Sequence, residues 1–328
     1  MTIQSILGNL SIEEFLAEYW QKKPLLIRNA FPNFESPLTP DELAGLSLEE
    51  EVESRIVFEK GESGPWELQH GPFDESIFAQ LPESCWSLLI QGADLWVPEV
   101  KALLPHFNFL PPWRVDDVMV SYAPVGGSVG PHFDYYDVFL LQGLGQRRWQ
   151  VGQFCDQQSP LVAGTPLRIL QTFDVVDEWV LQPGDMLYLP PGISHWGIAE
   201  NDCLTYSIGF RSPSLTDMLD DLTTELMTQG NSCYYRDPPL TPGMATEVIN
   251  PAFIKQVQAM LREIAEDKTL LGDWFARYMT APKYPELVDE ADVDRRATID
   301  GRHYLNGEQV DKWCITFGLL TVTCITYR

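Results

Sequence analysis

The middle of the chain constrains the fold more than any other part. From about residue 84 to residue 210, short apolar and β-branched runs are separated by glycine and proline turns. Short strands bounded by turn residues are typical of a β-sandwich or β-barrel. We therefore predict a mainly β core in this stretch. The length of 328 residues allows one large domain or several smaller ones.

The segment before this core begins with a predicted helix. Ser11 and Glu14 have the spacing of a capping box. Four apolar residues then follow at helical spacing: Phe15, Leu16, Tyr19 and Trp20. Pro24 ends this pattern, and residues 25–27 are apolar, which predicts a short buried strand.

Beyond Pro213 the pattern is helical to about residue 280. Asn250 followed by Pro251 is typical of a helix start. A stripe of apolar residues packs into a core or joins two copies of a chain, and the pattern leaves both open. Residues 281–285 then indicate a linker. The three stripes are Leu215, Met218, Leu219, Leu222 and Leu226; Ile254, Val257, Leu261 and Ile264; and Leu270, Leu271, Trp274, Phe275 and Tyr278.

The charge balance is strongly acidic. Aspartate and glutamate total 47 against 22 lysines and arginines, a net charge of −25. Direct binding to nucleic acid is disfavoured, because that affinity comes largely from basic side chains. The charge favours a basic partner, although solubility through self-repulsion explains it equally well. The six cysteines lack metal-site or disulfide spacing, and no secretory signal or long apolar run is present. We expect a reduced cytoplasmic protein.

Two histidines and an aspartate give the most specific chemical signal. On a strand, His132 and Asp134 would project to the same face, and His195 follows a turn-rich segment at residues 183–192. Two imidazoles and one carboxylate hold Fe(II) on one side and leave the other positions open for oxygen chemistry. A His-x-Asp pair also occurs by chance on surfaces. The glycine-rich residues 126–131 and the turn before His195 favour the metal site.

Two predicted strands each carry polar residues on one face. Asp117, Met119 and Ser121 alternate with apolar residues, so this face is either solvated or part of a pocket in which the carboxylate has a partner. Tyr136, Val138 and Leu140 alternate in the strand expected after the candidate ligands. The second polar face consists of Cys203, Thr205, Ser207 and Gly209.

Two adjacent arginines occupy a further predicted strand. Because Arg147 and Arg148 point to opposite faces, one of them points inward if the strand is half buried. An inward arginine beside a metal needs an anion, and a dicarboxylate co-substrate fits because the guanidinium binds carboxylates through two hydrogen bonds. A carboxylate of the protein itself is the alternative.

Four segments together resemble the JmjC-type, cupin-like Fe(II)- and 2-oxoglutarate-dependent oxygenases, and among these the ribosomal oxygenases. The segments are FLAEYWQKKPLLI (residues 15–27), VGPHFDYYDVF (129–139), GQRRW (145–149) and YSIGFR (206–211). The resemblance covers roughly residues 10–310. Its combined motifs are far more specific than any single triplet.

The resemblance implies a mainly β fold with helices and assigns roles to the site residues. It implies a double-stranded β-helix, the cupin jelly roll, in a catalytic domain at residues 1–212 with its core at about 84–212. A helical dimerisation region at 213–280 and a winged-helix-like segment at 281–328 would follow. Fe(II) would be held by His132, Asp134 and His195; 2-oxoglutarate by Arg147 and Ser121; and the substrate by Asp117, Met119, Tyr136 and Ser207.

The C-terminal segment departs from the family pattern. Residues 304–308, YLNGE, still resemble the family's wing, but the sequence from Asp311 onward does not. Residues 315–327 are apolar, threonine-rich and uncharged, a composition that favours strand pairing or aggregation. We therefore expect an incomplete winged-helix-like segment.

The implied activity is hydroxylation, with molecular oxygen, of an arginine in a basic large-subunit ribosomal protein. The resemblance implies a homodimer, and we expect no direct contact with nucleic acid or membrane. Asp117 suits a guanidinium substrate, and an acidic surface favours encounter with a basic protein. Removal of an N-methyl group is a second possibility that an aromatic cage would favour. A metal-binding cupin scaffold without turnover is a third, and Arg147 beside a complete ligand set argues against it.

Overall fold

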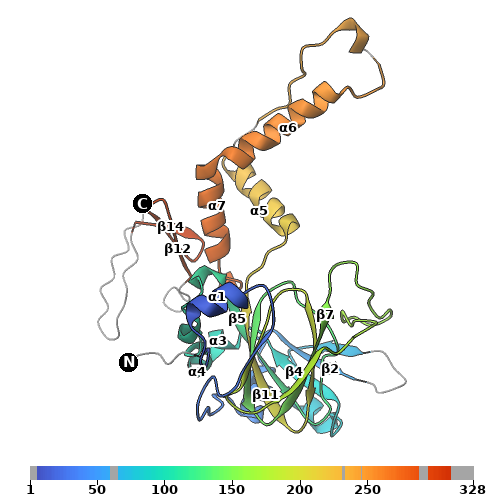
Figure 1. Cartoon of the computed structure of the whole chain (residues 1–328), viewed down its shortest axis with the longest axis vertical. Helices are drawn as coiled ribbons and strands as arrows, with labels where there is room; N and C mark the ends of the chain where they lie inside the picture. The colour runs from blue at the N-terminus through green and yellow to red at the C-terminus, as the bar shows by residue number, and fades with distance from the viewer. Residues whose placement is uncertain (1–5, 60–65, 231–232, 245, 288–294, 312–328) are drawn as a thin grey trace. The chain divides into compact units, whose positions relative to one another are not determined.

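The structure is a computed structural model that describes residues 6–59, 66–230, 233–244, 246–287 and 295–311. Contacts between Cα atoms divide the chain into two units, Met1–Ser212 and Pro213–Arg328 (Figure 1). The division falls where the β-rich sequence pattern gives way to a helical one. Within the described ranges, every helix is too short or too polar to cross a bilayer.

An eight-stranded antiparallel sheet forms the larger layer of the first unit. Its strand β11 (Cys203–Phe210) lies between β5 (Val115–Ala123) and β6 (Val138–Leu144) and is buried along its whole length. Strands buried on both faces are apolar or small at almost every position, which this segment satisfies. Beyond β6 lie β9 (Met186–Leu189) and then β1 (Leu25–Ile27) at one edge; beyond β5 lie β4 (Trp86–Ile90), β2 (Ser54–Phe58) and then β3 (Glu67–His70) at the other edge.

A three-stranded antiparallel sheet forms the smaller layer. Its order is β10 (Ile193–Ala199), β7 (Arg147–Phe154) and β8 (Asp177–Leu181). One apolar cluster draws residues from both sheets, so the two layers share a core, as in a jelly roll. The predicted mainly β fold is therefore confirmed. The buried cluster consists of Val138, Leu140, Leu187 and Leu189 from the larger sheet and Trp149, Val151 and Leu181 from the smaller.

The other face of the larger sheet packs against helices. A second buried apolar cluster lies between this face and the helices. It contains Val118 and Val120 of β5 together with Phe15 and Leu43 from helices. Because side chains alternate along a strand, the neighbouring polar residues of β5 must face the space between the sheets. In Figure 1, α1, α3 and α4 lie on the same flank of the strands. The helical segments are α1 (Ile12–Glu18), α2 (Pro40–Leu46), α3 (Ala93–Trp96), α4 (Pro98–Lys101), η2 (Glu75–Gln80), η3 (Leu104–Phe107) and η4 (Pro112–Arg114).

The first unit differs from the sequence-based expectation in three places. Strands β2 and β3 extend the sheet before residue 84: β2 pairs with the distant β4 and β3 pairs with β2, and this pairing outweighs a weak local pattern. Helical turns occupy much of residues 93–114, where their apolar residues cover the sheet. Tyr136 precedes β6 instead of belonging to it.

A buried carboxylate joins three segments of the first unit. Asp137 is fully buried and accepts hydrogen bonds from Tyr188 Oη (2.7 Å), Gln21 Nε2 (3.1 Å) and Arg114 Nη2 (3.2 Å). Burial raises the pKa of Asp137, and these three donors oppose the rise. The donors come from strand β9, the end of η4 and the residues after α1. The carboxylate therefore fixes the N-terminal segment against the sheet.

The second unit is built around α7. Its described part contains α5 (Leu215–Thr228), α6 (Pro251–Glu266), α7 (Lys268–Thr280), η5 (Pro242–Met244) and η6 (Pro285–Leu287), with a sheet of β12 (Arg296–Ile299), β13 (Arg302–Leu305) and β14 (Glu308–Val310). The three helices coincide with the three apolar stripes. Asn250 caps α6 and Pro251 occupies its first turn, as predicted.

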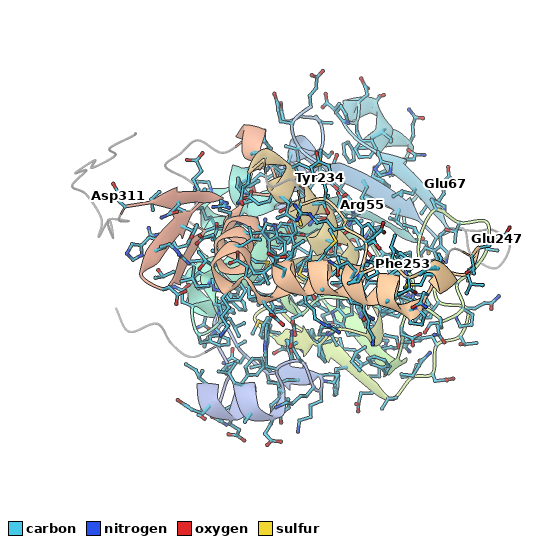
Figure 2. The ribbon with its side chains drawn as sticks, turned by 90° about the horizontal axis from the view of Figure 1, so that it is seen from above. Arg55, Glu67, Tyr234, Glu247, Phe253 and Asp311 are labelled. Carbon is cyan, nitrogen blue, oxygen red and sulfur yellow. The ribbon has the colours of Figure 1, made fainter. Side chains whose placement is uncertain are left out.

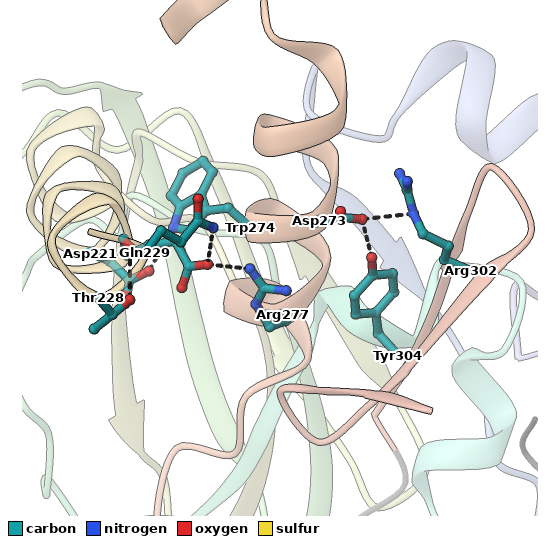
Figure 3. A network of polar contacts seen from close by, with 9 residues as sticks. Asp221, Thr228, Gln229, Asp273, Trp274, Arg277, Arg302 and Tyr304 are labelled. Atoms are coloured by element: carbon teal, nitrogen blue, oxygen red, sulfur yellow. Dashed lines mark hydrogen bonds and ion pairs between the residues drawn. The ribbon is translucent and has the colours of Figure 1, made fainter. Parts of the chain in front are cut away.

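Polar contacts hold both sides of α7 (Figure 3). Toward α5, Trp274 Nε1 donates to Asp221 Oδ1 at 2.7 Å, and Arg277 pairs with Glu225. Toward β13, Asp273 of α7 accepts a hydrogen bond from Tyr304 and lies 2.8 Å from Arg302 Nε. Several apolar residues of α5 and α6 are exposed within the chain: Leu215, Leu219, Met227, Ile254, Val257 and Leu261.

The winged-helix-like segment stays a prediction. Its described part is the small sheet of β12, β13 and β14, and residues 288–294 and 312–328 lie outside the described residues. The apolar run at residues 315–327 therefore lies outside them as well.

We predict that Arg114→Met destabilises the protein by about 3–5 kcal/mol, because it leaves the buried Asp137 carboxylate without its cation. Urea unfolding measures the loss. Arg148→Met is the matched control, since Arg148 contacts Glu178 and Glu200 near the surface, where an ion pair contributes about 1 kcal/mol or less. An equal cost for both variants would contradict the role of Asp137.

Candidate active site

Three candidate metal ligands converge where the connection between β5 and β6 meets β10. One ligand atom from each of His132, Asp134 and His195 lies within 4.8 Å of the others. His132 and His195 exchange backbone hydrogen bonds of 3.0 and 2.7 Å, and Asp134 O accepts one from Gly192 N at 2.8 Å. His132 and Asp134 therefore lie in a connection instead of the strand that the spacing suggested, and backbone pairing brings them to His195.

Backbone carbonyls orient both imidazoles. His132 Nδ1 lies 2.9 Å from Gly130 O, and His195 Nδ1 lies 3.1 Å from Ile193 O. A carbonyl oxygen only accepts, so each Nδ1 carries the proton and each Nε2 has a free lone pair. His195 Nε2 lies 3.6 Å from Asp134 Oδ2. Two imidazole lone pairs and one carboxylate are a donor set that fits Fe(II).

His195 is held in the neutral form that a metal requires. Burial, with a smaller contribution from His132, lowers the pKa of His195 to about 4, although the charge of Asp134 opposes this shift. A protonated imidazole has no lone pair for a metal. His195 is therefore ready to bind a metal at neutral pH without first losing a proton.

Arg147 is a buried cation beside this cluster. Its Nη1 donates to Ser121 Oγ at 3.4 Å and its Nη2 to Gly197 O at 3.2 Å, while its Cζ lies 5.1 Å from the ring centroid of Trp149. Burial lowers the pKa of Arg147, and its Nε has no hydrogen-bond partner among the described residues.

The buried Arg147 also has no carboxylate within ion-pair distance in the described part of the chain. The alternative of a protein carboxylate is therefore not supported there. A desolvated guanidinium with only neutral partners is poised for an anionic ligand. Arg148 points the other way and pairs with Glu178 and Glu200.

The expected substrate residues lie along the same inner face. The register pairs Ser207 with Met119 and Thr205 with Ser121, and paired residues of antiparallel strands share a face. Arg55, labelled in Figure 2, donates from Nη2 to Met119 Sδ at 3.5 Å. The two pairs are neighbours on the inner face of β5 and β11, and the pair that contains Ser121 is the one that Arg147 contacts.

Asp117 and Tyr136 border one small space beside Gly209 of β11. A Cβ atom added to Gly209 would lie 3.8 Å from Asp117 Oδ1 and 4.0 Å from Tyr136 Cε2. Asp117 is 6% exposed, and its Oδ2 accepts a hydrogen bond from Gln91 Nε2 at 2.8 Å. The charge of Asp134, burial and Asp117 together raise the pKa of Tyr136, so its hydroxyl stays neutral.

Two site residues had no recognisable signal in the sequence. Gln91 follows β4, and only the pairing of β4 with β5 brings it to Asp117. Gly197 pairs with Trp149 across β10 and β7, and a Cβ atom there would lie 2.7 Å from Arg147 Nε. Glycine is needed at this position because the guanidinium occupies the space of a side chain.

The fold and this cluster define a cupin-type oxygenase, and the comparisons with known proteins agree. A JmjC domain matches residues 102–218, and an AraC-like ligand binding domain matches residues 177–270. The Escherichia coli ribosomal protein uL16 3-hydroxylase is 36% identical over 278 residues, which are 84% of this chain and 73% of that protein. A probable ribosomal oxygenase of Haemophilus influenzae is 44% identical over 298 residues, or 87% and 73%.

Solved structures agree with the sequence comparison. The Escherichia coli ribosomal oxygenase YcfD in complex with cobalt and 2-oxoglutarate has a TM-score of 0.81 at 33% identity, covering 93% of this chain and 86% of that one. A second structure of that protein, with cobalt and succinic acid, has a TM-score of 0.80 at the same identity and coverage. The chain belongs to the JmjC-type ribosomal oxygenases, a family of Fe(II)- and 2-oxoglutarate-dependent enzymes. The predicted family is confirmed.

We predict that the metal-free protein loses stability on acidification because of His195. Its pKa is about 4 when folded and about 6.5 when unfolded, so the unfolded state binds the proton first as the pH falls. The free energy of unfolding should fall by about 1 kcal/mol by pH 5.5 and by up to about 3 kcal/mol below pH 4. Urea unfolding of the wild type and His195→Gln between pH 7.5 and 5.5 measures this. Equal losses in both would contradict the assignment.

Proposed function

We propose that the protein is an Fe(II)- and 2-oxoglutarate-dependent hydroxylase that adds a hydroxyl group to an arginine side chain of a large-subunit ribosomal protein. The names of its relatives support a ribosomal protein as substrate. The observation that carries the proposal is the buried Arg147, which has no carboxylate partner in the described part of the chain and lies beside a three-residue metal cluster. A scaffold that only bound a metal would not need this desolvated cation.

The residues of the site divide the work of the proposed reaction. His132, Asp134 and His195 would hold the metal. When bound, Fe(II) with oxygen and 2-oxoglutarate supplies the oxidation that places one oxygen atom in a C–H bond and converts 2-oxoglutarate to succinate and carbon dioxide. Arg147 would hold the distal carboxylate of 2-oxoglutarate. Ser121 accepts from Arg147, so its own hydroxyl hydrogen is free to bind the same carboxylate.

The far end of the pocket suits a guanidinium group. Asp117 offers a buried carboxylate that Gln91 orients, and the ring of Tyr136 borders the same small space. Met119 and Ser207 would line the wall beside the aliphatic part of the side chain. One phenol beside a carboxylate suits an arginine better than a methylammonium, which binds against several aromatic faces. The net charge of −25 would favour encounter with a basic protein.

We also propose that the protein acts in the cytoplasm as a homodimer joined through the helical region. The exposed apolar residues of α5 and α6 support this, since an apolar face of that size is usually covered by a partner. We propose no contact with nucleic acid, because the acidic charge opposes it.

The function is tested with iron, 2-oxoglutarate and peptides from basic large-subunit ribosomal proteins. We expect mass spectrometry to show the gain of one oxygen atom on an arginine, in step with succinate formation, and no product with His132→Ala. Loss of a methyl group from a methylated peptide, with no oxygen gain on arginine, would favour the demethylase. Absence of both products from every peptide would favour the scaffold.

We predict that Arg147→Ala weakens 2-oxoglutarate binding about ten- to a hundred-fold, because a charge-assisted contact contributes roughly 1.5–3 kcal/mol. Titration of the metal-loaded protein without peptide measures this directly. Arg148→Ala should bind 2-oxoglutarate as the wild type does. Unchanged binding by the Arg147 variant would assign the co-substrate to another residue.

We predict that Asp117→Asn lowers arginine hydroxylation at least about a hundred-fold, because a buried guanidinium without its anion costs about 3–5 kcal/mol. Conversion of 2-oxoglutarate in the absence of peptide should persist, since it does not use Asp117. Asp116→Asn is the matched control, because Asp116 lies next in the strand and pairs with Arg211. Wild-type hydroxylation of an arginine peptide by the Asp117 variant would overturn the arginine pocket.

A further inference from the structure

A single buried hydroxyl contacts both segments that carry the candidate histidine ligands. Ser128 is fully buried in the connection between β5 and β6. Its Oγ accepts a hydrogen bond from Gly130 N at 3.2 Å and one from Trp196 Nε1 at 3.0 Å. Gly130 lies two residues before His132, and Trp196 directly follows His195. The hydroxyl therefore links the segment that carries His132 to the segment that carries His195, without being a ligand itself.

The third partner of this hydroxyl is a carboxylate. Ser128 Oγ lies 3.0 Å from Glu59 Oε2. A hydroxyl has one hydrogen and two acceptor positions, while an indole N–H and a backbone N–H can only donate. Both acceptor positions of Ser128 are therefore used, and its one hydrogen must point to Glu59. Every hydrogen-bonding capacity of the hydroxyl is satisfied in a fixed direction.

Gly130 transmits this constraint to His132. Its carbonyl oxygen accepts from His132 Nδ1 at 2.9 Å, so the position of Gly130 sets the tilt of the imidazole. Gly130 has φ +81°, a left-handed conformation that favours glycine. Ile169 and Trp66 enclose it, since an added Cβ would lie 2.5 Å from Ile169 Cδ1. Ser128 accepts the hydrogen bond from the amide of this enclosed residue.

Trp196 transmits the constraint to His195 in a similar way. The indole ring packs edge-on against Phe173 with ring centroids 6.2 Å apart, and its N–H is fixed by Ser128. A fixed Trp196 restricts the backbone of the adjacent His195, whose amide and carbonyl pair with His132. Loss of the Ser128 hydroxyl would thus remove a constraint on both histidine segments and would leave the N–H groups of Gly130 and Trp196 and the Glu59 carboxylate without this partner.

We propose that Ser128 is a positioning residue of the metal centre, and that its hydroxyl, oriented by Glu59, sets the geometry in which His132 and His195 meet a divalent metal. Ser128 and Glu59 touch neither metal nor co-substrate in this role. The inference rests on the proposed function, because it assumes that the three-residue cluster binds a metal.

Binding of Co(II) to the metal-free protein tests the inference without turnover. Ser128→Ala should raise the Kd for Co(II) about ten- to a hundred-fold and should change the visible absorption of the bound ion, which reports ligand geometry. Ser128→Thr keeps the hydroxyl and should restore both. Ser87→Ala is the matched control: Ser87 is also fully buried, but among the described residues its hydroxyl donates to a backbone oxygen, Ser128 O, at 3.3 Å. It should bind Co(II) within about twofold of the wild type.

A second pair of variants keeps the test decisive if Ser128→Ala does not fold. Glu59→Gln retains an acceptor for the hydroxyl and should bind Co(II) as the wild type does, whereas Glu59→Leu should weaken binding. A folded Ser128→Ala with wild-type affinity and spectrum would overturn the inference, as would equal binding by the two Glu59 variants.

His132→Ala separates this result from the proposed function. If this variant binds Co(II) as well as the wild type, the metal site itself is wrong and the proposed function fails. If it loses Co(II) while Ser128→Ala does not, only the positioning role is wrong.

Discussion

The backbone pairing between His132 and His195 is the contact on which the site depends. Two backbone hydrogen bonds join the connection after β5 to the first residues of β10. They therefore link a segment next to the larger sheet with a strand of the smaller sheet. The same bonds bring the two imidazoles to a centroid distance of 4.3 Å and place Asp134 beside them. This one backbone pairing thus connects two segments far apart in the sequence and brings the candidate ligands together.

Desolvation sets the chemistry around this contact. In the buried space between the sheets, His195 is kept neutral, Arg147 has only neutral partners among the described residues, and the carboxylate of Asp117 is oriented by an amide. In water, the charge of each of these groups would be stabilised by solvation. Burial makes each of them depend strongly on the sign of its neighbour, because an unpaired polar group in this environment costs several times more than in water. The selectivity of the pocket therefore depends on the charges of these buried groups as well as on their contacts.

Sequence patterns identified much of the larger unit because its local signals agree with its tertiary structure. The turn-bounded apolar runs of the middle segment became strands, and the alternation in β5 predicted that Asp117, Met119 and Ser121 share a face. The adjacent arginines separated as expected, with Arg147 buried and Arg148 more exposed. Patterns failed where pairing partners lie far apart in the chain. Strand β2 forms by pairing with β4 and β3 by pairing with β2, and the turns at residues 93–114 are helical because they cover a sheet face.

The sequence by itself determined the chemical types: two imidazoles and a carboxylate, two adjacent arginines of which one could point inward, an aspartate that shares a strand face with Met119 and Ser121, and the turn-bounded pattern of a mainly β fold. These follow from residue identity and from spacing along the chain, although His132 and Asp134 lie in a connection and not in the strand that their spacing suggested. Only the tertiary structure decided which groups meet. The contact of Gln91 with Asp117, the space that Gly197 leaves for Arg147, and the bridge from Ser128 to Gly130 and Trp196 each join residues from different strands or connections. Such contacts depend on strand order and register, which no local pattern encodes, because register is set by the summed burial of the whole sheet.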